Sequence, residues 1–418
     1  MQTNTESAAA KRRAYLQGLI FTVLLTIVGF ALNYITWPSR AQIPPWPGNI
    51  MIGGGFLAVL VLIHLFFRKR AWVRWLAGVP VAICSVSMYT LLVLIMGFLP
   101  QTDTETTTWV QQFGFSHLAS SWIMVVIQTY MLSSLGLITI RRLIPLHRKN
   151  IGFFLNHAGL WLTLVAASIG TSDFYRLQVP LMEGEDYLPF AYNDKGEQYH
   201  LPYSLALKNF EIEEYPAQLA VFNKNTSKIA PTPTQESWPH CAEGVKIKYR
   251  DIQAEVVKFL PLASREGEEK NYTISNEPNA AQASLVHIRT ATTDTTVWLS
   301  NGNFVMPYKM YHANDSLAVV MLQAEVKSYR SYIKWRTKDQ KTDSAWLEVN
   351  KPLTVAGWKI YQISYDEEQG RWSDKSVLEA VADPWLPTVY VGIFMMLAGA
   401  VYLFWQGRKS HTQTKNEE

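Results

Sequence analysis

The feature that most constrains this chain is the apolar stretch at residues 151–172, IGFFLNHAGLWLTLVAASIGTS. About twenty apolar residues are enough for one helix to cross a bilayer. The stretch follows a basic loop and ends where a long polar segment begins, so we interpret it as a membrane anchor that leads into a domain. His157 lies inside its basic end, roughly 10 Å along a helix. An ionisable side chain at that depth is costly in hydrocarbon, which indicates a functional role.

Other apolar stretches of similar length flank the polar segment. Clusters of Lys and Arg lie at alternate ends of these stretches, beginning with Lys11-Arg12-Arg13. Because basic loops stay on the cytoplasmic side, both termini are predicted to be cytoplasmic and the polar segment periplasmic, in a bacterial inner (cytoplasmic) membrane. The membrane-spanning helices are predicted at residues 14–36, 50–67, 75–99, 117–140, 151–172 and 385–405.

The polar segment alternates apolar and polar residues in stretches such as 203–215 and 316–335, with turn residues between them. This alternation is typical of strands, so we expect a β-sandwich or a barrel-like domain attached to the membrane at both ends. The predicted fold class is an integral membrane α-helical bundle with a large β-rich extracytoplasmic domain between the fifth and sixth helices. The predicted organisation is 1–172 for five transmembrane helices, 173–384 for the β-rich domain, 385–406 for the sixth helix and 407–418 for a cytoplasmic tail.

Several function classes lack support in the sequence. Cys84 lies in an apolar stretch and Cys241 in the polar segment, so we expect no disulfide, and the absence of C-x-x-C excludes thioredoxin-type chemistry. The net charge of +4 is small and its basic residues lie beside apolar stretches, which does not indicate a nucleic-acid surface. The sequence also has no P-loop, C-x-x-C-H, H-E-x-x-H or G-x-S-x-G motif.

Among the nine histidines, only His64 and His157 lie well inside predicted helices, each near the basic end. Imidazole is a common axial ligand of haem iron, and two imidazoles at one depth can hold one haem. The alternative is an imidazole that is hydrogen-bonded within the bundle or reaches the interface. His117 lies at the outer end of a predicted helix, where an interfacial histidine is ordinary.

Four stretches share the pattern of a known family. They are FFLNHAGLWLTLVAASIG, then DFYRLQVPLMEGE, then LPYSLALKNFEIEEY, and finally residues 349–399, which contain Asn-x-Pro-Leu, Gly-aromatic-x-x-Tyr-Gln-x-Ser-Tyr and an Asp-Pro before the last helix. In this order and topology they resemble the ResB (CcsB) family, a membrane component of system II cytochrome c biogenesis.

The resemblance implies a haem delivery or handling subunit of a cytochrome c synthase, accessory to the haem lyase reaction that joins haem to apocytochrome c. Haem b would be a transient cargo, and the partner would be a separate CcsA-type membrane protein, because the tryptophan-rich haem-handling segment of that partner is missing here. The family's intramembrane haem ligand corresponds to His157, with the second ligand expected from the partner. We therefore predict His157 and His64 as cofactor-binding residues, His157 as the metal ligand, and no catalytic residue.

Two alternatives stay open from the sequence. The chain could be a b-type haem quinol-oxidising membrane subunit of a periplasmic reductase, which would need both His64 and His157 as ligands. It could also be a membrane-anchored scaffold or sensor whose outer domain binds a protein. Many ResB members have three helices before the outer domain, whereas five are predicted here, and this difference leaves the position of His64 within the family open.

Overall fold

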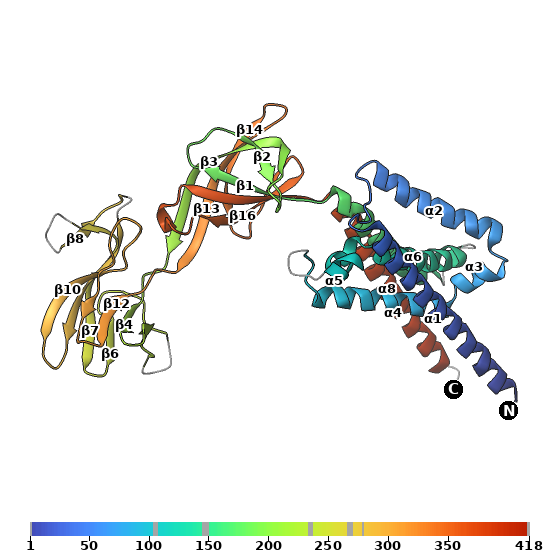
Figure 1. Cartoon of the computed structure of the whole chain (residues 1–418), viewed down its shortest axis with the longest axis horizontal. Coiled ribbons are helices and arrows are strands. Elements are labelled where there is room, and N and C mark those ends of the chain that lie inside the picture. The colour runs from blue at the N-terminus through green and yellow to red at the C-terminus, as the bar shows by residue number, and fades with distance from the viewer. Residues whose placement is uncertain are drawn as a thin grey trace. The chain divides into compact units, whose positions relative to one another are not determined.

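The computed structural model describes residues 2–102, 108–143, 150–232, 237–265, 271–277 and 280–415. The chain divides into two compact units, one formed by residues 1–174 with 383–418 and the other by residues 175–382. The first unit is helical and the second is built from strands (Figure 1).

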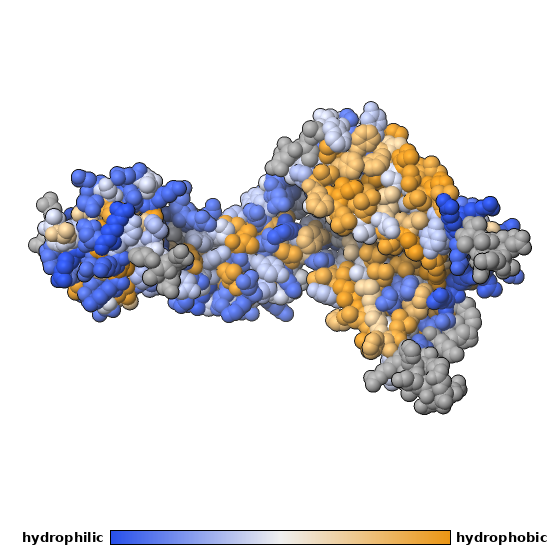
Figure 2. Space-filling model, turned by 90° about the horizontal axis from the view of Figure 1, so that it is seen from below, coloured by the Kyte–Doolittle hydropathy of each residue, from blue (hydrophilic) through white to orange (hydrophobic). Residues whose placement is uncertain are grey.

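Six helices of the described chain are long and apolar enough to cross a membrane, which confirms the predicted number. Their outward side chains are apolar, as Phe98 and Phe66 show with 85% and 75% exposure. Figure 2 shows this apolar surface over the helical unit. These apolar helices make the chain a multi-pass membrane protein. The six are α1 (Gln2–Thr36), α2 (Gly48–Phe67), α4 (Val79–Phe98), α6 (Trp122–Leu143), α7 (Ile151–Ile169) and α8 (Leu386–Lys415).

Three predicted helix starts differ clearly from the structure. The first helix, expected from residue 14, begins at Gln2. The helix expected at residues 75–99 is divided into α3 (Ala71–Leu76) and α4, because Pro80 has no backbone N–H for a continuous helix and fits only in a first turn. The helix expected from residue 117 begins at Trp122. His117 lies instead in the 3-10 helix η1 (Phe115–Ser120), where its backbone is non-helical, and η1 follows the short helix α5 (Thr108–Gln112).

Helices α7 and α8 pack against each other through glycines. A Cβ atom on Gly159 of α7 would lie 2.6 Å from the carbonyl oxygen of Gly392 on α8. Small residues let helix backbones approach closely in a membrane, where water does not drive helices together. This contact fixes the position of α7, the helix that carries His157.

The strand-built unit contains an eight-stranded antiparallel sheet, which curls nearly into a barrel. Its order is β14-β13-β3-β2-β1-β17-β16-β15, and its interior holds fully buried side chains such as Leu205, Ile333 and Leu378. The strands are β1 (Tyr175–Met182), β2 (Leu188–Tyr192), β3 (Gln198–Glu214), β13 (Val326–Thr337), β14 (Thr342–Glu348), β15 (Leu353–Val355), β16 (Trp358–Tyr365) and β17 (Lys375–Ala382).

Between β3 and β13 the chain forms two further sheets that share one core. Leu219 and Val320 come from one sheet, and Val256 and Ile288 from the other. The predicted fold class is thus confirmed, and both sequence-based alternatives, a sandwich and a barrel-like sheet, occur in one unit. The strands are β4 (Leu219–Asn223), β5 (Lys228–Ile229), β6 (Lys246–Tyr249), β7 (Ile252–Arg265), β8 (Tyr272–Ile274), β9 (Ala281–Arg289), β10 (Asp294–Ser300), β11 (Tyr311–His312) and β12 (Leu317–Met321).

Candidate functional site

His157 is held on α7 by a hydrogen bond within its own helix. Its Nδ1 lies 3.0 Å from the carbonyl oxygen of Phe153, one turn earlier. A carbonyl oxygen only accepts, so Nδ1 carries the proton and a neutral ring keeps its lone pair on Nε2. The side chain is half-buried. Nε2 is therefore the nitrogen through which His157 can ligate a metal ion, with the backbone bond orienting the ring.

Aromatic rings extend the surroundings of His157 along one face of α7. The ring of Phe153 stacks on His157 with centroids 3.6 Å apart, and the guanidinium carbon of Arg142 lies 4.1 Å from the Phe153 centroid. One turn beyond His157, Trp161 donates from Nε1 to the carbonyl oxygen of Leu132 on α6 at 3.1 Å. Residues four apart share a helix face. The face that carries His157 is consequently the one that packs on α6.

His64, on α2, has different surroundings. Its side chain is only 4% exposed, and Nε2 has no hydrogen-bond partner within the described ranges. It lines a pocket of about 340 Å³ near the end of α2. Within the same ranges, no carboxylate forms an ion pair with the cationic side chains of this pocket. The remaining lining residues are Arg68, Lys69, Val73, Arg74, Ala77, Leu137 and Arg141.

Both predicted histidines lie beside the C-terminal end of α6. Arg141 lines the pocket of His64, and the next residue, Arg142, covers the ring that stacks on His157. Sequence reasoning treated these arginines only as topology signals. Their place at the end of an apolar stretch was visible, but which histidine each would approach depended on packing between helices. Arg148 and Lys149, the remaining basic residues expected in this loop, lie outside the described residues.

At the opposite end of the bundle, a carboxylate that was not predicted as a site residue holds three segments together. Asp173 accepts hydrogen bonds from the backbone N–H of Trp46 at 2.9 Å, from Nδ2 of Asn49 at 2.7 Å and from Nε1 of Trp385 at 2.8 Å. The side chain is 8% exposed. These bonds link the segment before α2, the end of α7 and the start of α8. The sequence feature that could have indicated this role is a single acidic residue directly after an apolar stretch.

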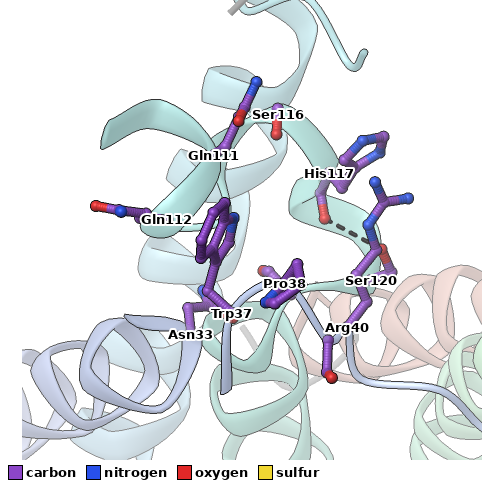
Figure 3. Close-up of a pocket in the computed structure, with 12 residues that line it drawn as sticks. Asn33, Trp37, Pro38, Arg40, Gln111, Gln112, Ser116, His117 and Ser120 are labelled. Atoms are coloured by element: carbon purple, nitrogen blue, oxygen red, sulfur yellow. Dashed lines mark hydrogen bonds between the residues drawn. The ribbon is translucent and has the colours of Figure 1, made fainter. Parts of the chain in front are cut away.

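A second pocket of the bundle, of about 200 Å³, contains His117 but neither predicted site residue. Figure 3 shows Arg40 extending toward His117 and Ser120, with the ring of Trp37 nearby. The hydroxyl of Ser120 donates to the backbone carbonyl of His117 at 3.3 Å. We assign this pocket no cofactor.

The residues of the most recognisable sequence block have structural roles. Gln362 is buried among strands, where its Oε1 accepts from the hydroxyl of Ser331 at 2.5 Å and its Nε2 donates to the hydroxyl of Ser376 at 3.0 Å. In the Asp-Pro pair, Oδ1 of Asp383 accepts from the backbone N–H of Leu386 at 3.0 Å, which caps the first turn of α8. The block therefore stabilises the fold, and the candidate ligand lies elsewhere.

Comparison with known proteins gives a match in the strand-built unit. No curated protein sequence matches the chain. The model of the ResB-like family matches residues 281–376, from the first residue of β9 into β17. The match confirms the predicted resemblance to this family of cytochrome c biogenesis system II, and it covers neither His64 nor His157. Residues 281–376 are thus similar to the ResB-like family, the chain also carries six apolar helices long enough to span a membrane, and this likeness implies a role in cytochrome c biogenesis.

Proposed function

We propose that this chain is the haem-handling subunit of a cytochrome c synthase. In this proposal haem b is a transient cargo, a CcsA-type membrane protein is the partner, and apocytochrome c receives the haem. The observation that carries the proposal is His157, a half-buried imidazole in a membrane helix whose Nδ1–H is bonded to a backbone carbonyl. Such an imidazole has the tautomer of an axial iron ligand, with the lone pair on Nε2.

The residues around His157 suit a haem. Nε2 of His157 would bind the iron, and the partner would supply the second ligand, as the resemblance implies. Phe153 and Trp161, one turn before and one turn after His157, give its surroundings the apolar character that a porphyrin needs. The guanidinium of Arg142, which lies over Phe153, would pair with a haem carboxylate. By the positive-inside rule this haem would lie toward the cytoplasmic side and the strand-built unit in the periplasm.

The test is the haem spectrum of the full chain purified with its partner. We expect His157→Ala to lose most of the bound haem and added imidazole to restore it, because a free imidazole can occupy the place of the missing side chain. The exposed His312 of β11 provides the control, and His312→Ala should keep the wild-type haem content. An unchanged haem content in His157→Ala would remove this residue from the ligand role.

A second candidate function is a b-type cytochrome subunit that oxidises quinol for a periplasmic reductase. The observation in its favour is the buried Nε2 of His64, which has no partner among the described residues. In this case His64 and His157 would both bind iron. The chain without any partner would retain haem, His64→Ala and His157→Ala would lose it equally, and quinol would reduce it reversibly. Cells without this chain would then still attach haem covalently to cytochrome c, whereas the first proposal predicts that they do not.

A further inference from the structure

We propose that the pocket around His64 binds the phosphate group of an anionic phospholipid. This inference goes beyond the proposed function, because it concerns a ligand other than haem. Four cationic side chains, Arg68, Lys69, Arg74 and Arg141, line one pocket of about 340 Å³. Like charges that share one pocket repel each other, and the repulsion is stronger next to an apolar bundle than in water. A bound anion would neutralise them.

His64 points to the same ligand independently of the charges. His64 lines this pocket, and its Nε2 is buried and lacks a hydrogen-bond partner in the described part of the chain. A buried polar nitrogen without a partner is costly, so such atoms are nearly always satisfied by protein, water or ligand. An oxygen of a phosphate in the pocket would accept a hydrogen bond from Nε2–H, while the arginines would pair with its other oxygens.

The surroundings favour a lipid phosphate over a soluble one. The apolar side chains of Val73, Ala77 and Leu137 share the pocket with the cations. Next to the pocket, Trp72 of α3 is 48% exposed and packs on Phe67 at the end of α2, a position typical of the membrane interface. Basic pockets between membrane helices on the cytoplasmic side are known to hold phospholipid head groups.

The experiment uses native mass spectrometry on the full chain in a neutral detergent, without haem. Phosphatidylglycerol is titrated against the wild type, Arg141→Gln and His64→Phe, and phosphatidylcholine with the same acyl chains is titrated in parallel. The matched control is Arg142→Gln, the same change at the next residue, which lies over Phe153 and outside the pocket. Arg141→Lys keeps the charge and shows whether a loss in Arg141→Gln reflects misfolding.

We expect phosphatidylglycerol to bind more tightly than phosphatidylcholine, and Arg141→Gln to weaken its binding about fivefold. His64→Phe should also weaken it, whereas Arg142→Gln and Arg141→Lys should stay close to wild type. Equal losses in Arg141→Gln and Arg142→Gln, or equal binding of the two lipids, would overturn the proposal. Displacement of the lipid by millimolar inorganic phosphate would overturn the lipid assignment in favour of a soluble phosphate. Because no haem is present, a failure here leaves the haem proposal intact.

Discussion

The buried polar groups at the two ends of the helical unit differ in how completely they are hydrogen-bonded. At one end, Asp173 is buried and accepts three hydrogen bonds, from Trp46, Asn49 and Trp385. At the other end, His64 is buried with an Nε2 that has no partner within the described residues, and it lies beside cations that form no ion pair there. Burial alone therefore does not indicate a binding site. A group whose bonds are complete holds the helices together, and a group whose bonds are incomplete is available to a ligand.

The largest expected effect comes from removing the complete network. Asp173→Leu would leave the backbone N–H of Trp46 and Nε1 of Trp385 without this acceptor, whereas Nδ2 of Asn49 would still donate to the carbonyl oxygen of Ile169. Each unsatisfied donor costs about 1–3 kcal/mol, so we expect a loss of about 2–6 kcal/mol in the unfolding free energy. Denaturant unfolding of the full chain in detergent measures this loss.

Thr171→Ala is the control, because the exposed Thr171 hydroxyl donates to the carbonyl oxygen of Ser168 and takes no part in the Asp173 network. A loss below about 1 kcal/mol in Asp173→Leu would mean that the network does not hold the bundle.

The contact between α7 and α8 should give the next largest effect. Gly159→Leu would force the helices apart, at a cost of about 2 kcal/mol, and would also lower haem binding because α7 carries His157. A Cβ atom added at Gly97 of α4 would meet no atom of the described residues within 4 Å outside its own helix, so Gly97→Ala should be neutral or slightly stabilising. Unfolding free energy and haem content, measured on the same samples, check both statements. Equal effects of the two substitutions would contradict the role of the Gly159 contact.

Two substitutions to phenylalanine, one at each end of the helical unit, compare directly how each buried group affects stability. Trp385→Phe removes one donor to Asp173 and should cost about 1 kcal/mol. His64→Phe removes a nitrogen that has no partner within the described residues, so in lipid-depleted, haem-free protein it should be neutral or stabilise by about 1 kcal/mol. Unfolding midpoints measured side by side decide the sign. Destabilisation by His64→Phe would show that its ring nitrogen is already satisfied in the protein itself.

A smaller effect is expected in the strand-built unit. Its carboxylate Glu214 lies between the two cases above, because it has polar neighbours but at long distances. Gln282 lies 3.4 Å and Arg371 3.6 Å from its Oε2, and burial raises the pKa of this carboxyl above its ordinary value of 4.5. The folded state thus holds the proton more tightly than the unfolded chain does. The contribution of Glu214 to stability is complete below pH 4.5 and is lost as the pH rises through the raised pKa.

The neighbouring Glu213 supplies a control with the opposite sign. It is exposed, and its hydrogen bond to Lys327, with 2.7 Å between the charged atoms, lowers its pKa. Its contribution is therefore present above its ordinary pKa and lost as the pH falls. The unfolding free energy of wild type minus that of Glu214→Gln should decrease from pH 4 to pH 8, whereas the same difference for Glu213→Gln should increase. Two parallel trends would show that burial does not govern Glu214.

Local patterns were enough to predict most elements. Apolar length located the six helices, and alternation located the long strands β3 and β13. The errors occurred where the sequence gives no clear helix start. Pro80 lies in the first turn of α4 although its neighbours are apolar, and the chain before Trp122 mixes apolar with polar residues.

The candidate site could be predicted only in part. His157 and its nearest contact are close together in the sequence, whereas the other contacts of the site join segments that are far apart in the sequence. His157 stands out in the sequence as an ionisable residue in an apolar helix, and its contact with Phe153 is four residues away. The pocket of His64 combines α2 with Arg141, which is distant along the chain. The network of Asp173 likewise joins Asn49 to Trp385. Such contacts depend on how the helices pack, which a local sequence pattern does not predict.

The path of the chain between β3 and β13 has a consequence for engineering. The two strands pair from Glu214 with Val326 onward, and the backbone N–H of Tyr215 donates to the carbonyl oxygen of Glu325 at 2.8 Å. The whole sandwich thus leaves and rejoins the barrel-like sheet at neighbouring points. A tight hairpin turn could therefore replace residues 216–324 without interrupting a strand of the barrel-like sheet. The replacement would remove contacts such as the hydrogen bond from Nε1 of Trp372 to the carbonyl oxygen of Ala280, 3.0 Å long.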